Sequence, residues 1–152
     1  MLVYRISKTK FANDLSGEGA RLYGGRWNSK LTPCIYTSES RALALLEYTV
    51  NINIDDVPRT LSITTFEIPD ENILAFEEHK LPGDWKDIPA PSSTKKFGTA
   101  HLIAAKSPVI KVPSTVIHDE FNYILNPRHA DSKLFKILEV KDFVYDIRIK
   151  LN

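Results

Sequence analysis

Apolar and polar residues alternate along much of this chain, as they do in β-strands that bury one face. β-branched and aromatic residues are concentrated in the same stretches, and turn-forming residues separate them. The pattern predicts strands at residues 1–7, 34–37, 59–68, 73–76, 108–112, 114–118, 133–140 and 143–150. The last two would form a closing pair, and residues 122–127 would form a turn-rich loop.

Two other stretches have the spacing of a helix that buries one face. In residues 39–50 apolar positions recur at i, i+3, i+4 and i+7, and Ser38 is placed to cap the start. Residues 94–106 form the second predicted helix, with Thr94 as its cap. Residues 12–33 are rich in glycine, and we expect turns there.

These elements add up to an α+β fold in which strands dominate. No regular strand–helix–strand repeat occurs, which argues against a doubly wound parallel sheet. The stretch richest in Pro and Ser, residues 82–93, is only as long as a loop and does not divide the chain. We therefore expect a single domain over residues 1–152.

The composition, 43% hydrophobic and 26% charged, is that of an ordinary globular protein. No stretch approaches roughly 18 consecutive apolar residues, and the first ten residues lack the apolar core of a signal peptide. The single cysteine, Cys34, cannot form an internal disulfide and fits a reducing cytosol. We expect a cytoplasmic protein with no membrane contact, in which Cys34 is a small buried residue.

The net charge of +1 excludes a general attraction to nucleic acid. The charge is uneven, however: residues 1–50 carry +3, residues 51–93 carry −6, and residues 94–152 carry +4. Basic regions around a pocket would suit an anionic ligand, and solvated surface charge would give the same distribution.

The segment from Gly17 to Asn28, GEGARLYGGRWN, combines four glycines with Arg21 and Arg26. It is neither a Walker A loop nor a dinucleotide-binding fingerprint, because neither spacing occurs. Guanidinium groups bind phosphate through paired hydrogen bonds, and glycine lets a backbone approach a ligand closely. The segment suits a pyrophosphate, and a surface loop with solvated arginines is the alternative.

Three further side chains are candidates on weaker grounds. Tyr36 lies in a predicted strand, where it either joins the core or stacks on a flat ligand ring. Glu47 shares a helix face with Leu43 and Val50, so its carboxylate needs an ion-pair partner or a function. Ser114 lies at a strand junction and is uninformative alone. The four histidines lack metal-ligand spacing, so we expect no metal site.

Taken together, these motifs resemble the RES-domain family, which is named after an Arg, a Glu and a Ser. The resemblance rests on GEGARLYGGRWN, IYTSESRALALLE, LPxxW at Leu81–Trp85, VPS at Val112–Ser114, FNYILNP and the closing DIRI. It extends from Tyr4 to Arg148, which is nearly the whole chain.

The resemblance implies an ADP-ribosyltransferase-like fold, a split and mostly antiparallel β core with a few helices. It also implies the toxin of a type II toxin–antitoxin system, which depletes cellular NAD by hydrolysis or phosphorolysis of the nicotinamide–ribose bond. NAD would be the substrate, and no metal is implied. The partner would be a helix-turn-helix antitoxin that binds DNA itself and blocks the cleft, while homo-oligomerisation is left open.

Carried over residue by residue, the family's Arg, Tyr, Glu and Ser match Arg26, Tyr36, Glu47 and Ser114, which are thereby predicted as catalytic. NAD binding is predicted for Arg26 and Tyr36, together with Arg5 and with Asn126 of the NP turn. One departure is His101, which stands where the family often has a Trp and predicts a change in packing or at the rim.

In this interpretation Arg26, aided by Arg5, binds the pyrophosphate, and Tyr36 stacks on nicotinamide. Glu47 faces the ribose cation, and Ser114 positions the ribose or the amide. Two alternatives use the same cleft: transfer of ADP-ribose to a protein target, and an inactive binding module. Retention of all four residues speaks against the inactive module.

Overall fold

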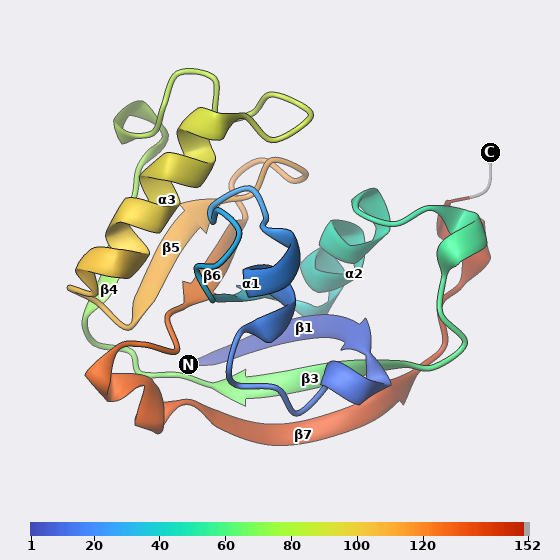
Figure 1. Cartoon of the computed structure of the whole chain (residues 1–152). Coiled ribbons are helices and arrows are strands. Elements are labelled where there is room, and N and C mark those ends of the chain that lie inside the picture. Colours follow the sequence, from blue (N-terminus) through green and yellow to red (C-terminus); the bar gives the residue numbers. More distant parts are fainter. Residues whose placement is uncertain (151–152) are drawn as a thin grey trace.

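The structure is a computed structural model that describes residues 1–150. These residues form a seven-stranded sheet and three α-helices (Figure 1). The strands are β1 (Leu2–Lys8), β2 (Ile35–Ser38), β3 (Leu61–Glu67), β4 (Ile73–Ala75), β5 (Val109–Pro113), β6 (Phe121–Leu125) and β7 (Lys136–Phe143). The helices are α1 (Glu18–Tyr23), α2 (Arg41–Val50) and α3 (Ser92–Ala104).

The sheet has the strand order β4-β5-β6-β2-β1-β3-β7. Neighbouring strands are antiparallel except β4 and β5, which are parallel. The predicted α+β class with a mostly antiparallel core is therefore confirmed. Successive side chains of β6 enter opposite faces, with Tyr123 and Leu125 in one hydrophobic cluster and Ile124 in the other.

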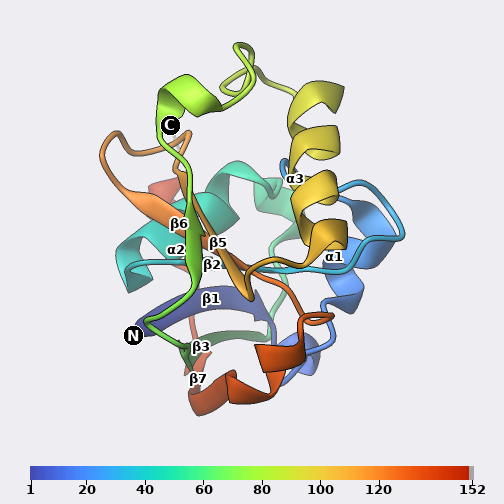
Figure 2. The ribbon, with the colours of Figure 1, turned by 90° about the vertical axis from the view of Figure 1, so that its left-hand side faces the viewer.

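Each face of the sheet carries its own core. One cluster contains Val3, Ile35, Phe66, Ile68, Val109, Tyr123, Leu125 and Phe135. The other contains Trp27, Cys34, Leu81, Trp85, Leu102, Ile110, Val112 and Ile124. The second cluster includes Leu102 of α3 and is joined by Ala20 of α1, so both helices cover this face, and Figure 2 shows α3 beside β5 and β6.

The sheet splits between β1 and β2. These two strands share a single register pair, Tyr4 with Ser38, whereas β1 and β3 pair along seven residues. Strands that separate so soon leave the side chains between them without a partner strand. The split is thus the natural place for a cavity, and α2 packs against both strands beside it.

The two longer helices begin two residues away from the predicted positions. Ser40, not Ser38, caps α2, since its hydroxyl accepts a hydrogen bond from the Leu43 amide at 3.0 Å. Ser38 instead ends β2, where its hydroxyl donates to Asn122. Helix α3 begins at Ser92, and Thr94 lies inside it as a fully buried residue.

Helix α1 was missed because its sequence is bounded and interrupted by glycines. Gly17 and Gly24, with φ of +73° and +71°, flank the helix at its two ends. A Cβ at Gly17 would meet the Cys34 backbone at 2.8 Å, so glycine is also required there for packing. The glycine-rich segment is therefore an ordered helix and turn against β2, and not a mobile loop.

The loop predicted at residues 122–127 is wrong, because residues 121–125 form β6 in the middle of the sheet. Asn122 made the segment look polar, yet its side chain is used by the neighbouring elements. Only Asn126 and Pro127 belong to the turn that follows.

Two predicted strands in the second half of the chain are also wrong. Residues 114–118 form a turn, because the Ser114 hydroxyl accepts hydrogen bonds from the Val116 and Ile117 amides. The last predicted strand, 143–150, is replaced by a short 3-10 helix, Ile147–Ile149, that Asp146 caps. Within residues 1–150, no helix is both long and apolar enough to cross a membrane.

Candidate active site

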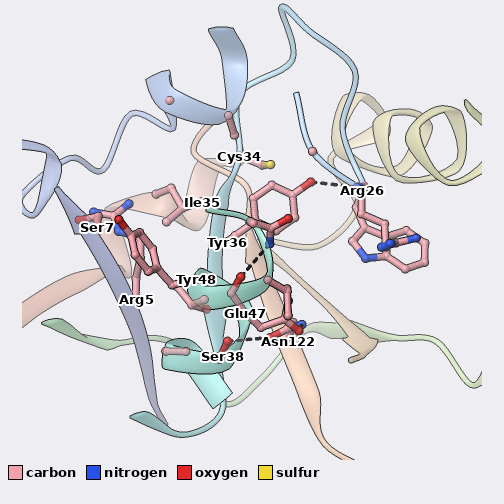
Figure 3. A pocket seen from close by; sticks show the side chains of 18 of the residues that line it. Arg5, Ser7, Arg26, Cys34, Ile35, Tyr36, Ser38, Glu47, Tyr48 and Asn122 are labelled. Carbon is pink, nitrogen blue, oxygen red and sulfur yellow. Dashed lines mark hydrogen bonds between the residues drawn. The ribbon is translucent and has the colours of Figure 1, made fainter. Parts of the chain in front are cut away.

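A cavity of about 930 Å³ opens in the split between β1 and β2. Its volume is typical of a site for a small-molecule ligand. Arg26, Tyr36 and Glu47 line it, as does Arg5 on the opposite side of Tyr36 from Arg26 (Figure 3). The fourth predicted catalytic residue, Ser114, lies directly behind Glu47.

Glu47 is held by two donors from distant parts of the chain. The Ser114 hydroxyl donates to its Oε1 at 2.8 Å, and the Asn122 amide Nδ2 donates to the same oxygen at 2.6 Å. Its other oxygen, Oε2, accepts no hydrogen bond within residues 1–150. The carboxylate is therefore fixed in direction and keeps one oxygen for a ligand.

Ser114 has no hydrogen-bonding capacity left for a ligand. Its hydroxyl donates to Glu47 and accepts from the amides of Val116, at 3.0 Å, and Ile117, at 3.2 Å. The residue is only 5% exposed, and its neighbours Pro113 and Thr115 line the cavity instead. The Ser114 hydroxyl therefore orients Glu47, and Ser114 does not line the cavity, so its contact with a substrate stays a prediction.

Tyr36 is fixed by hydrogen bonds at its hydroxyl. The hydroxyl donates to Asn28 Oδ1 at 2.7 Å and accepts from the Trp27 amide at 2.9 Å. Burial raises the pKa of the Tyr36 phenol well above its usual value, so it stays neutral. A Cβ at Gly25 would meet that hydroxyl at 2.6 Å, which explains why a glycine faces the ring.

Arg26 both holds a loop and keeps donors for a ligand. Its Nη1 donates to the carbonyls of Trp85 at 2.8 Å and Asp87 at 2.9 Å, which ties residues 85–87 to the cavity. Burial lowers the pKa of the guanidinium, while the charges of Glu47 and Asp87 raise it. Arginine stays protonated near neutral pH, so Arg26 is a cation whose charge solvent only partly screens.

Arg5 lies at the other end of the cavity and donates more hydrogen bonds to the backbone than Arg26 does. Its Nη2 donates to the carbonyls of Phe11, Ala12 and Asp14, and its Nε is buried without a partner. Burial lowers the pKa of Arg5, and the Asp14 carboxylate raises it. The guanidinium thus anchors the segment after β1 and faces a counter-charge already present.

Two residues singled out in the sequence are not in the cavity. Asn126 is 1% exposed, donates to the Leu102 carbonyl at 2.9 Å and accepts from the Arg128 amide. It holds the turn after β6 and does not line the cavity, so its contact with NAD stays a prediction. Arg21 forms a bidentate pair with Glu18 on α1, and it does not line the cavity.

Sequence reasoning missed the two asparagines that orient the site. Asn122 donates to Glu47, and the fully buried Asn28 accepts from Tyr36 while donating to the carbonyls of Ala20 and Thr32. Both lie inside motifs that were noted, GEGARLYGGRWN and FNYILNP. No local sequence signal marks these roles, because the two asparagines act on Tyr36 and Glu47, 8 and 75 positions away.

Cys34 lines the cavity but has no reactive character. It is 1% exposed, and burial raises the pKa of its thiol to about 12. The thiol is therefore protonated near neutral pH and is a poor nucleophile. Within residues 1–150 no cluster of three or more His, Cys, Asp or Glu side chains could hold a metal ion.

His101 packs inside an aromatic group outside the cavity. Its ring centroid lies 4.8 Å from those of Phe76 and Phe97. Burial lowers the pKa of its imidazole, with a smaller contribution from Lys106. His101 therefore contributes to the packing between α3 and the segment that follows β4.

Comparison with known proteins shows to which family the chain belongs. A family model described as RES domain matches residues 2–147. A Yersinia enterocolitica protein named Toxin Res is 36% identical over 152 residues, covering 99% of this chain and 100% of that protein. A Sphingobium protein named Prs ADP-ribosylating toxin is 36% identical over 147 residues, covering 94% of this chain and 91% of that protein.

A solved structure with a similar fold is the M. tuberculosis MbcT–MbcA toxin–antitoxin complex. The matching chain has a TM-score of 0.75 and 19% identity, with 93% of this chain and 83% of that chain covered. This likeness shows that the chain shares its fold with a chain of that complex. The family match and the level of identity show that the chain belongs to the RES domain family.

Proposed function

We propose that this chain is the toxin of a toxin–antitoxin pair and that it depletes NAD by cleaving the nicotinamide–ribose bond. The observation that carries the proposal is the placement of Glu47, which lines the same cavity as Tyr36 and Arg26 and whose Oε2 accepts no hydrogen bond within residues 1–150. The names of the relatives, Toxin Res and Prs ADP-ribosylating toxin, support a toxin that uses an ADP-ribosyl donor.

The chemistry needs a fixed negative charge more than it needs a strong nucleophile. Nicotinamide leaves NAD as a neutral molecule, and the ribose develops positive charge as the bond breaks. A carboxylate held rigidly before the reaction stabilises that charge without reorganising. We assign this role to Glu47, with Ser114 and Asn122 as positioning residues that keep Oε1 occupied.

The rest of the cavity would hold the dinucleotide in a bent form. The ring of Tyr36, fixed at its hydroxyl, offers a flat face on which nicotinamide can stack. The remaining nitrogens of Arg26 would bind the pyrophosphate, and Arg5 would add its charge from the other end. Holding both ends of the reacting bond in one geometry supplies part of the rate enhancement.

As a toxin, the chain would act as a single catalytic domain and would be restrained by an antitoxin. The toxin–antitoxin complex with a similar fold supports a protein partner of this kind. We propose a helix-turn-helix antitoxin that covers the cavity. In this proposal the antitoxin contacts DNA and this chain does not.

The products of the reaction test the proposed function. Purified protein is incubated with NAD, with and without inorganic phosphate, and the small products are separated by chromatography. Free nicotinamide with ADP-ribose indicates hydrolysis, and a phosphorylated ADP-ribose that forms only with phosphate indicates phosphorolysis. Intact NAD under both conditions would refute the proposal.

A second candidate is transfer of ADP-ribose to a protein, which the Sphingobium relative's name favours. It uses the same cavity, and only the acceptor differs. NAD labelled in its adenylate part would leave label on a protein of a host lysate, dependent on Glu47. Label only in small products would exclude this candidate.

A further inference from the structure

Three cationic side chains line the cavity, and two of them have acidic neighbours. Arg5 faces Asp14, which also lines the cavity and contributes a counter-charge to it. Arg26 lies within reach of the charges of Glu47 and Asp87. The third cation is Lys95, at the start of α3.

Lys95 has no acidic ion-pair partner within residues 1–150. It is half-buried and lines the cavity. The neighbouring Lys96 is exposed and does not line the cavity. Two adjacent lysines of one helix therefore have different surroundings, and only one faces the ligand space.

The position of Lys95 is unfavourable for the helix itself. It follows the first turn of α3, where the helix dipole favours acidic side chains, and that turn holds none. Asp84 accepts a hydrogen bond from Ser93 there, but it does not pair with Lys95. A lysine near a helix N-terminus, with no contact that compensates for its charge, is expected where function requires the charge.

We propose that Lys95 binds the pyrophosphate of the dinucleotide together with Arg26, and that it sets the preference for a dinucleotide over a nucleoside. The inference rests on the proposed function and adds a binding residue to it. The ammonium group supplies a mobile point charge beside the planar fork of Arg26, and two such cations suit a diphosphate.

The adjacent lysine provides a matched control. In the full chain, Lys95→Gln is compared with Lys96→Gln for the KM of NAD and for the dissociation constant of ADP-ribose by calorimetry. Loss of a charge-assisted hydrogen bond should weaken both constants about tenfold in Lys95→Gln, with kcat nearly unchanged. Lys96→Gln should match the wild type, and both variants should melt at wild-type temperature.

A second ligand separates phosphate binding from a general effect on the site. Nicotinamide riboside has no phosphate, so its binding should be equal in Lys95→Gln and wild type. The NAD affinity of the wild type should fall with salt more steeply than that of Lys95→Gln, because one ionic contact is lost. Equal ADP-ribose affinity in Lys95→Gln and wild type, or equal loss in both variants, would overturn the proposal.

Failure of the two proposals can be told apart. If the wild type neither binds ADP-ribose nor releases nicotinamide, the proposed function fails and the Lys95 proposal fails with it. If the wild type does both and Lys95→Gln behaves identically, only the Lys95 proposal fails.

Discussion

Two parts of the cavity differ in how completely their polar groups are used. Around Glu47, Oε1 is fixed by donors from β6 and from the turn after β5. Around Arg26, Nη1 holds residues 85–87, and Lys95, which lines the same cavity, makes no ion pair among the described residues. The Glu47 part is suited to chemistry and the cationic part to binding, so changes in the first should alter kcat and changes in the second KM.

The largest expected effect is that of Glu47→Gln. The amide keeps the size of the side chain but removes the negative charge that opposes the ribose cation. We expect kcat to fall by roughly 10²–10³-fold with little change in KM. Initial rates of nicotinamide release measure this, and an unchanged melting temperature shows that the fold is kept. A variant that retains half of the wild-type rate would break the assignment.

Arg26→Ala should give the next largest effect, on KM. Removing the fork loses a charge-assisted contact with phosphate and frees residues 85–87, so we expect KM for NAD to rise about 10–100-fold. Arg21→Ala is the control, because Arg21 pairs with Glu18 outside the cavity. Equal KM values in the two variants would contradict the difference between the two parts of the cavity.

Asn122→Ala should lower kcat about tenfold and leave KM nearly unchanged. The variant removes the 2.6 Å donor to Glu47 Oε1, so the carboxylate is less well oriented, while the cavity keeps its cations. Steady-state kinetics with NAD measure both constants. A KM effect larger than the kcat effect would show that Asn122 binds substrate directly instead of positioning Glu47.

Gly98→Ala tests the packing of α3, the helix that carries Lys95. A Cβ at position 98 would lie 1.9 Å from the Trp27 carbonyl oxygen, so the helix or the Arg26 segment must shift. We expect a loss of about 1–3 kcal/mol in the free energy of unfolding, measured with urea. In the folded fraction, KM should rise more than kcat falls.

The smallest effect is that of His101→Phe on the pH dependence of stability. Burial lowers the pKa of His101 in the folded chain, so protonation opposes folding. The stability associated with the neutral imidazole is present above its ordinary pKa of 6.5 and is lost as pH falls below it. Urea unfolding at pH 7.5 and pH 5 should show a smaller loss for the variant than for the wild type.

The sequence predicts the elements better than it predicts their contacts. Strand and helix periods located β1, β2, β3 and α2 to within two or three residues. The sequence predicts a turn-rich loop at residues 122–127, whereas residues 121–125 form β6 and the Asn122 side chain donates to Glu47 of α2. A polar residue whose partner lies 75 positions away leaves no local signal.

The site shows the same limit. The family motifs led to Arg26, Tyr36 and Glu47, which line one cavity, but they could not show that Ser114 lies behind the carboxylate. An asparagine such as Asn126 is a common ligand contact, yet here its side-chain amide donates to the Leu102 carbonyl. Roles such as these depend on hydrogen-bond partners brought together by the fold, and residue type alone does not determine them.

The orientation of bound NAD in a crystal of the Glu47→Gln variant tests this division of the cavity most directly. The account predicts the nicotinamide ribose within hydrogen-bond distance of the side chain at position 47, nicotinamide on the Tyr36 ring, and the pyrophosphate against Arg26 and Lys95. A pyrophosphate bound at position 47, or a dinucleotide bound outside this cavity, would contradict it.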